Sequence, residues 1–64
     1  MDQYIRDGLF VMRTVGYSAS EAAKLIIYVD HDLEGRGETP ENIAACADLE
    51  LRLVAAASIQ QGSE

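Results

Sequence analysis

Five carboxylates gather in the middle of this 64-residue chain, over the stretch DHDLEGRGETPE at residues 30–41. They take the first, third, fifth, ninth and twelfth positions of the stretch, and Gly35 takes the sixth. Oxygen atoms at alternate positions around a glycine turn are the ligands that Ca²⁺ prefers. The same letters also suit an acidic surface turn, in which glycines end one helix and Glu41 complements the positive end of the next. The acidic turn needs fewer assumptions.

The stretch resembles the calcium-binding loop of the EF-hand family, which coordinates the ion through positions 1, 3, 5, 7, 9 and 12. The resemblance implies a backbone carbonyl ligand at position 7 and side-chain ligands elsewhere. The implied ligands are Asp30, Asp32, Glu34, Arg36, Glu38 and Glu41. The chain departs from the family at Glu34, where the pattern has Asp or Asn, and at Gly37, where it has an apolar residue. Calcium binding is therefore an alternative hypothesis, and the main interpretation expects no cofactor.

The sequence gives little support for catalysis or for DNA binding. The chain has one histidine, His31, one cysteine, Cys46, and no glycine-rich phosphate loop, so we expect that it is not an enzyme. The segment GYSASEAAKLI is similar to the turn and second helix of a helix-turn-helix. Its helix start offers Ser20, Glu21 and Lys24, whereas base reading favours Arg, Lys, Asn or Gln there. A DNA-binding regulator remains a further alternative, and direct nucleic-acid binding is not expected.

Local signals predict an all-α fold, a single domain of three helices over about 3–15, 18–34 and 40–60. Asp2 is the first N-cap, Gly16 can end the first helix, and SASE at residues 18–21 forms a capping box. Thr39 followed by Pro40 restarts the chain. In the second helix the predicted inward face is Ala22, Leu25, Ile26, Val29 and Leu33, with Ile27 outside it.

The third helix is apolar around most of its circumference, and such a helix is expected to be buried on nearly all sides. One face carries Ile43, Ala47, Leu51 and Val54, and another carries Ala45, Cys46, Leu49, Leu53 and Ala56. One face can meet the first two helices, and the other needs a partner. We predict a homodimer packed through this helix, with a two-fold axis as the closed solution. Its predicted interface is Cys46, Leu49, Leu53, Ala56 and Ile59.

Composition and charge indicate where in the cell we expect the protein. The net charge is −6, and residues 30–50 hold seven acids against the single base Arg36. The start MDQYIRDG lacks the basic region of a signal peptide, and charges interrupt the longest apolar region, so we expect a protein without a membrane span. With only one cysteine, a reducing cytoplasm is the expected compartment.

These features together favour a small acidic interaction module, an adaptor or an inhibitor that covers a basic or nucleic-acid-handling surface of a partner protein. Apolar anchors within a charged rim are typical of protein interfaces. The predicted partner-binding residues are Phe10, Ile27, Tyr28, Asp30, Asp32, Glu34 and Glu38.

Overall fold

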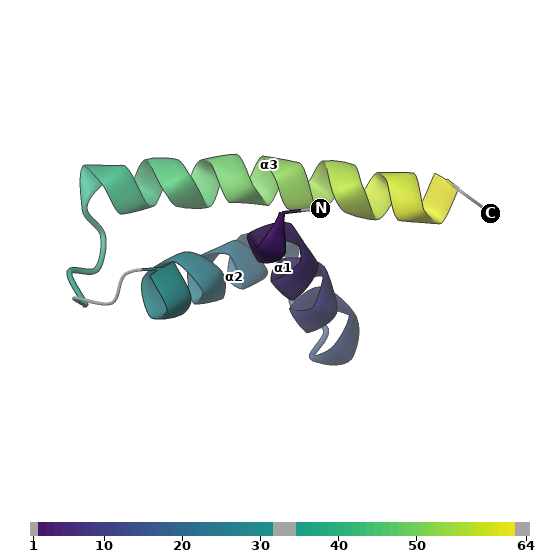
Figure 1. Cartoon of the computed structure of the whole chain (residues 1–64), viewed down its shortest axis with the longest axis horizontal. Helices are drawn as coiled ribbons and strands as arrows, with labels where there is room; N and C mark the ends of the chain where they lie inside the picture. The colour runs from purple at the N-terminus through teal and green to yellow at the C-terminus, as the bar shows by residue number, and fades with distance from the viewer. Residues whose placement is uncertain (1, 32–34, 63–64) are drawn as a thin grey trace.

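The computed structural model describes residues 2–31 and 35–62, and all regular structure within those ranges is helical. The elements in chain order are α1 (Gln3–Thr14), α2 (Ala19–Leu25), η1 (Ile26–His31) and α3 (Pro40–Gly62). α3 lies along the whole length of the molecule, and α1 and α2 lie beneath it (Figure 1). The prediction of a compact, all-α fold with three helices is confirmed. The last residues of the predicted second helix, 32–34, lie outside the described ranges.

Each helix begins where the local sequence predicts it. The Tyr4 amide donates to Asp2 Oδ1 at 2.7 Å, and the Asn42 amide donates to Thr39 Oγ1 at 3.1 Å. At the start of α2 the Glu21 amide donates to Ser18 Oγ at 3.1 Å, and the Ser18 amide donates to Glu21 Oε1 at 2.9 Å. Amides in the first turn of a helix have no partner within the helix, so these side chains satisfy donors that would otherwise face water.

The end of α1 is also the predicted one. Gly16 has a φ of 89°, in the left-handed region where glycine has no steric penalty. Its amide donates to the Met12 carbonyl at 3.2 Å, which closes the last turn of the helix. The chain then turns sharply into α2.

The core lies between the lower face of α3 and the two shorter helices. Its buried members are Leu9, Ala22, Ala23, Ile26, Ile27, Leu49 and Leu53. Leu53 has no exposed surface and lies against Gly8 of α1, where an added Cβ would come within 2.6 Å of Leu53 Cδ2. A glycine inside a helix lowers helix stability, so its place here is explained by the close crossing of α1 and α3.

The inward face of the second helix is only partly the one we predicted. Ala22 and Ile26 are buried, as predicted, but the rest of the buried face is formed by Ala23 and Ile27. The predicted inward residues Leu25 and Val29 are exposed. The buried face at residues 22, 23, 26 and 27 also has helical spacing. Ala22 and Ala23 have small side chains, which let α2 approach α3 closely. The Cys46 thiol reaches the Ala23 carbonyl at 3.8 Å across this contact. From Ile26 the helix widens to the i→i+5 hydrogen bonding of a π-helix, which alters the direction of every later side chain.

Within the described residues, none of the helices combines the length and the apolar composition that a membrane-crossing segment needs.

Candidate functional site

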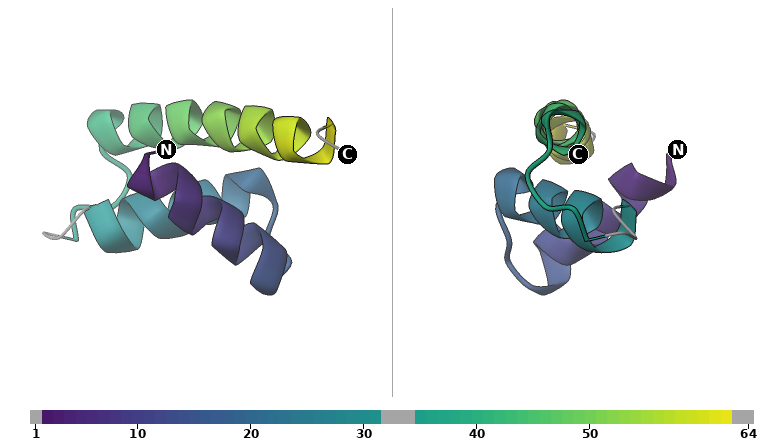
Figure 2. Two further views of the ribbon diagram at one scale, coloured as in Figure 1. Left: turned by 45° about the vertical axis from the view of Figure 1, so that its right-hand side comes forward. Right: turned by 90° about the vertical axis from the view of Figure 1, so that its left-hand side faces the viewer.

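The side of α3 that faces away from the core carries large apolar side chains. Leu51 is 71% exposed, Ile43 51% and Val54 50%. An end-on view of α3 shows α1 and α2 together on one side of it, with the opposite side uncovered (Figure 2). Three alanines that are also exposed lie between these larger residues: Ala44, Ala47 and Ala55. We call Ile43, Ala44, Ala47, Leu51, Val54 and Ala55 the outer face of α3.

Acidic residues border the outer face. At about 100° per residue, Asp48 and Glu50 lie on its two edges, and Glu41 lies on the same edge as Asp48, about two helical turns earlier. Asp48 and Glu41 are exposed, and Glu50 is half-buried. The Arg52 guanidinium Nε lies 2.9 Å from Asp48 Oδ2, one helical turn away, so the nearest base is already paired with an acid. The outer face is therefore an apolar surface between negative edges.

The structure places the predicted homodimer residues elsewhere. Leu49 and Leu53 are buried inside the chain, and Cys46 and Ala56 are half-buried against the same core. Ile59 is exposed. The assignment of Leu49 and Leu53 to a surface that contacts a second chain is therefore corrected: both pack against α1 and α2. The face that we had grouped with Leu51 and Val54 is the one left uncovered.

Two contacts explain why α3 turns the face with Leu49 and Leu53 toward the core. The Asn42 side-chain amide donates to the Gly37 carbonyl at 2.7 Å, and Asn42 is 2% exposed. This bond fixes the rotation of α3 relative to the preceding loop, and residues seven and eleven positions later, Leu49 and Leu53, share its face. Gly8 supplies the space that Leu53 fills. A glycine in the middle of the predicted first helix was the sequence signal for this close approach.

One of the predicted partner-binding residues does not reach the surface. Ile27 is 2% exposed and belongs to the core, so its assignment to a binding surface is corrected. Phe10 is exposed on α1, Tyr28 is half-buried, and Asp30 and Glu38 are exposed. Asp32 and Glu34 lie outside the described residues. Ile27 faces inward because it lies one helical turn after Ala23 and continues the same buried stripe.

Tyr28 is held by its surroundings in the protonated form. Loss of hydration raises the pKa of the Tyr28 hydroxyl, and a side-chain hydrogen bond with Cys46 and the negative charge of Glu38 add to the effect. The Cys46 thiol in turn donates to the Ala23 carbonyl. This contact links η1, α3 and α2, so Cys46 acts as a packing and hydrogen-bonding residue of the fold.

The acidic stretch at residues 30–41 is organised around glycines and Asn42. Gly35 and Gly37 have φ values of 67° and 75°, and the Thr39 amide donates to the Gly37 carbonyl at 2.9 Å. Among the described residues, no three His, Cys, Asp or Glu side chains come together in a group that could hold a metal ion. Two of the six ligands implied by the EF-hand resemblance, Asp32 and Glu34, are outside those residues. Calcium binding stays a prediction.

Comparison with protein-family models, with curated proteins and with solved structures found no match to this chain.

Proposed function

We propose that this chain is a small acidic protein–protein interaction module with no chemistry of its own, and that the outer face of α3 is its binding surface. The observation that supports this proposal is the exposure of Ile43, Leu51 and Val54 on the side of α3 opposite the core. A contiguous apolar surface rimmed by polar residues is typical of a binding site. Burying it would remove apolar area from water, which is the main favourable contribution in most protein association.

Charge selects the kind of partner. The outer face lies between Asp48 and Glu50, in a chain of net charge −6. Opposite charges across an interface favour encounter and binding, whereas like charges oppose them. The partner that fits best is a protein surface or helix with apolar side chains flanked by Lys or Arg. By covering such a basic surface, the chain would act as an adaptor or as an inhibitor of a nucleic-acid-handling protein.

A second copy of the chain is the competing occupant. The exposed alanines Ala44, Ala47 and Ala55 would let two α3 helices approach closely. A two-fold pair would also close on itself without leaving a face open. Such a homodimer, predicted from the sequence on the opposite face, would now use Leu51 and Val54. It would bring the acidic edges of two copies together, which costs free energy at low salt.

Designed helical peptides test the preference directly. Two peptides of equal length would carry the same leucine and alanine seam, one flanked by lysines and the other by glutamates. We expect the full chain to bind the lysine peptide more tightly, by fluorescence anisotropy, and added salt to weaken that binding. The variant Leu51→Glu with Val54→Glu should abolish it. Phe10→Glu is the matched control, since Phe10 is exposed on α1, and it should leave binding unchanged.

Sedimentation of the chain alone shows whether a second copy of the chain or a basic partner is the occupant of the outer face. If a second copy covers the outer face, the mass should rise with concentration, and higher salt should strengthen the association because it screens the acidic edges. A basic partner predicts the opposite salt response and a monomer at the concentrations used for the peptides. Equal binding of both peptides, or binding that survives the double glutamate variant, would refute the proposed surface.

A further inference from the structure

A pocket of about 130 Å³ lies between the first turn of α1 and the middle of α3, on a different side of α3 from the outer face. Its apolar wall comes from three helical segments. The residues of that wall are Ile5, Ile27, Ala45 and Leu49. None of them belongs to the outer face, and of the pocket's other residues Asp48 lies on an edge of that face. Binding in the pocket does not depend on the function proposed above.

The size of the pocket limits what can enter it. Pockets for drug-sized ligands and cofactors usually measure about 300–1,000 Å³, well above this volume. An apolar cavity of about 150 Å³ takes up one benzene molecule. The pocket between α1 and α3 therefore has room for one branched or aromatic group, and not for a nucleotide or a comparable cofactor.

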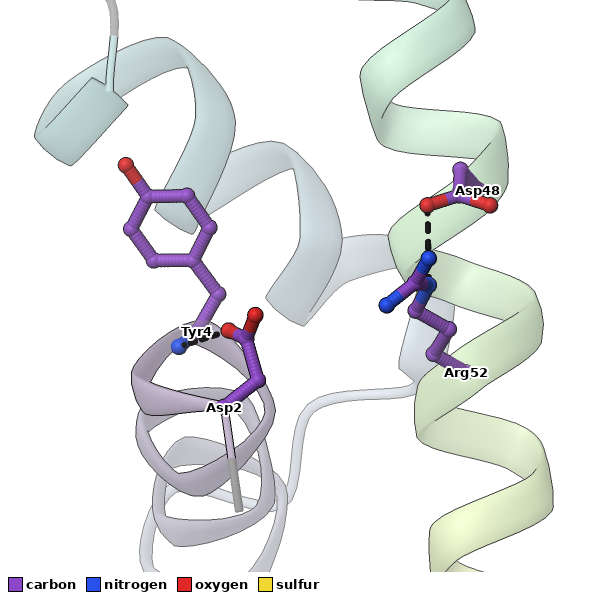
Figure 3. Close-up of polar contacts among 4 residues, drawn as sticks. All are labelled: Asp2, Tyr4, Asp48 and Arg52. Carbon is purple, nitrogen blue, oxygen red and sulfur yellow. Dashed lines mark hydrogen bonds and ion pairs between the residues drawn. The ribbon is translucent and has the colours of Figure 1, made fainter.

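Charged side chains stand on the rim, on both helices. Figure 3 shows Asp2, at the start of α1, on the side toward α3, from which the Arg52 side chain points toward it. Asp2, Tyr4, Asp48 and Arg52 all line the pocket. Arg52 Nε is 2.9 Å from Asp48 Oδ2, so these two charges offset each other. Asp2 Oδ1 accepts from the Tyr4 amide at 2.7 Å. A carboxylate can accept several hydrogen bonds, so the helix cap leaves Asp2 with capacity for a further donor.

The rim thus carries two carboxylates against one guanidinium, above an apolar wall. We propose that this pocket binds a small apolar group that bears a primary ammonium, with the apolar part against Ala45 and Leu49 and the ammonium beside Asp2 and Asp48. Such a ligand satisfies both halves of the site at once. An anionic ligand of the same shape would place its charge beside Asp2, and Arg52, the base among the residues that line the pocket, is already paired with Asp48.

The first measurement is a titration of the ¹⁵N-labelled full chain with 2-phenylethylammonium, followed by two-dimensional NMR. We expect saturable shifts at the amides of Ile5, Ala45 and Leu49, and small or no shifts at Leu51 and Val54. The matched anion 3-phenylpropionate should bind about fivefold more weakly, the contribution of one exposed ion pair. Equal or tighter binding of the anion would overturn the proposal, as would shifts confined to the outer face.

Two variants test the two halves of the site. Ala45→Leu, which fills the pocket, should remove the saturable shifts, and Ala45→Ile serves if the leucine variant does not fold. Asp2→Asn with Asp48→Asn should keep binding of the aromatic group but lose the preference for the ammonium, and the asparagine at position 2 still caps α1. Glu41→Gln with Glu50→Gln is the control, since it changes the net charge equally outside the pocket and should keep the preference.

A third probe identifies the source of the ammonium. The peptide Phe-Gly-Gly-amide with a free amino terminus presents the same chemistry as a polypeptide would, and its N-acetylated form removes the charge. Tighter binding of the free peptide than of 2-phenylethylammonium would assign the pocket to the amino-terminal residue of a partner chain. Weaker binding would assign it to a small amine. Loss of discrimination between the free and the acetylated peptide would refute the role of the rim carboxylates.

Discussion

The inner and outer faces of α3 carry the same kinds of residue and have opposite surroundings. Leu53 on the inner face has no exposed surface, whereas Leu51, two residues away, is among the most exposed apolar side chains of the molecule. Helix propensity does not distinguish two leucines on one helix. The difference arises from what lies opposite: Gly8 provides a space for Leu53, and no described element covers Leu51. Burial in α3 is therefore set by the shape of α1 and α2.

Truncation of the two leucines should give the largest contrast. Leu53→Ala removes fully buried methyl groups and should lower the free energy of unfolding by about 2–5 kcal/mol. Leu51→Ala should change it by no more than about 0.5 kcal/mol, as is usual for surface positions. Chemical denaturation followed by circular dichroism measures both. A core this small supplies about 3–5 kcal/mol, so Leu53→Val is the graded variant if the alanine variant is unfolded.

Loss of the bond between Asn42 and Gly37, which fixes the rotation of α3, should have the next largest effect on stability. Asn42→Ala leaves the Gly37 carbonyl without its side-chain donor and should lower the free energy of unfolding by about 1–3 kcal/mol. Ile43→Ala, at the adjacent position on the outer face, is the matched control and should have a much smaller effect. If the two variants were equally stable, the bond between Asn42 and Gly37 would not be what orients the helix.

The crossing of α1 and α3 offers a double-mutant test. Gly8→Ala pushes a methyl group against Leu53, and such overpacking costs about 1–3 kcal/mol, offset by about 1 kcal/mol of better helix propensity. In the Leu53→Ala background the same methyl group enters the vacated space, so Gly8→Ala should there be neutral or stabilising. Additive effects in the four-protein cycle would contradict a direct contact between the two residues.

The smallest effect should come from the exposed capping box of α2, Ser18 and Glu21. The hydrogen bond from the Ser18 amide, together with that of its hydroxyl, holds the pKa of Glu21 below its ordinary value of 4.5. The ionised form therefore favours the folded state at pH above 4.5, and this contribution is lost as the pH falls through the lowered pKa. Glu21→Gln should show a weaker loss of stability than wild type between pH 5 and the acid limit. Identical pH profiles of the two proteins would show that ionised Glu21 does not contribute to stability.

Local chemistry explains which parts of the fold were predictable. Asp2, Ser18, Thr39 and Gly16 act within one helical turn of themselves, and all four take the predicted capping or turn role. The inward face of the second helix was predicted only in part: Ala22 and Ile26 are buried as predicted, but Ala23 and Ile27 complete the buried face in place of Leu25 and Val29, because two stripes on the helix have the same period. Both apolar faces of α3 were visible in the sequence, but the one chosen for a partner was the one that the core uses.

The amino-acid sequence by itself determined the number of helices, where each of them begins, where the first one ends, and the excess of negative charge around the middle of the chain. These properties depend on hydrogen bonds and charges between near neighbours. Only the tertiary structure decided that Leu53 faces Gly8, that Leu51 and Val54 face outward, and that Asp2 and Asp48 meet at one pocket. Such contacts join residues on different helices, and their geometry depends on how closely the helices approach.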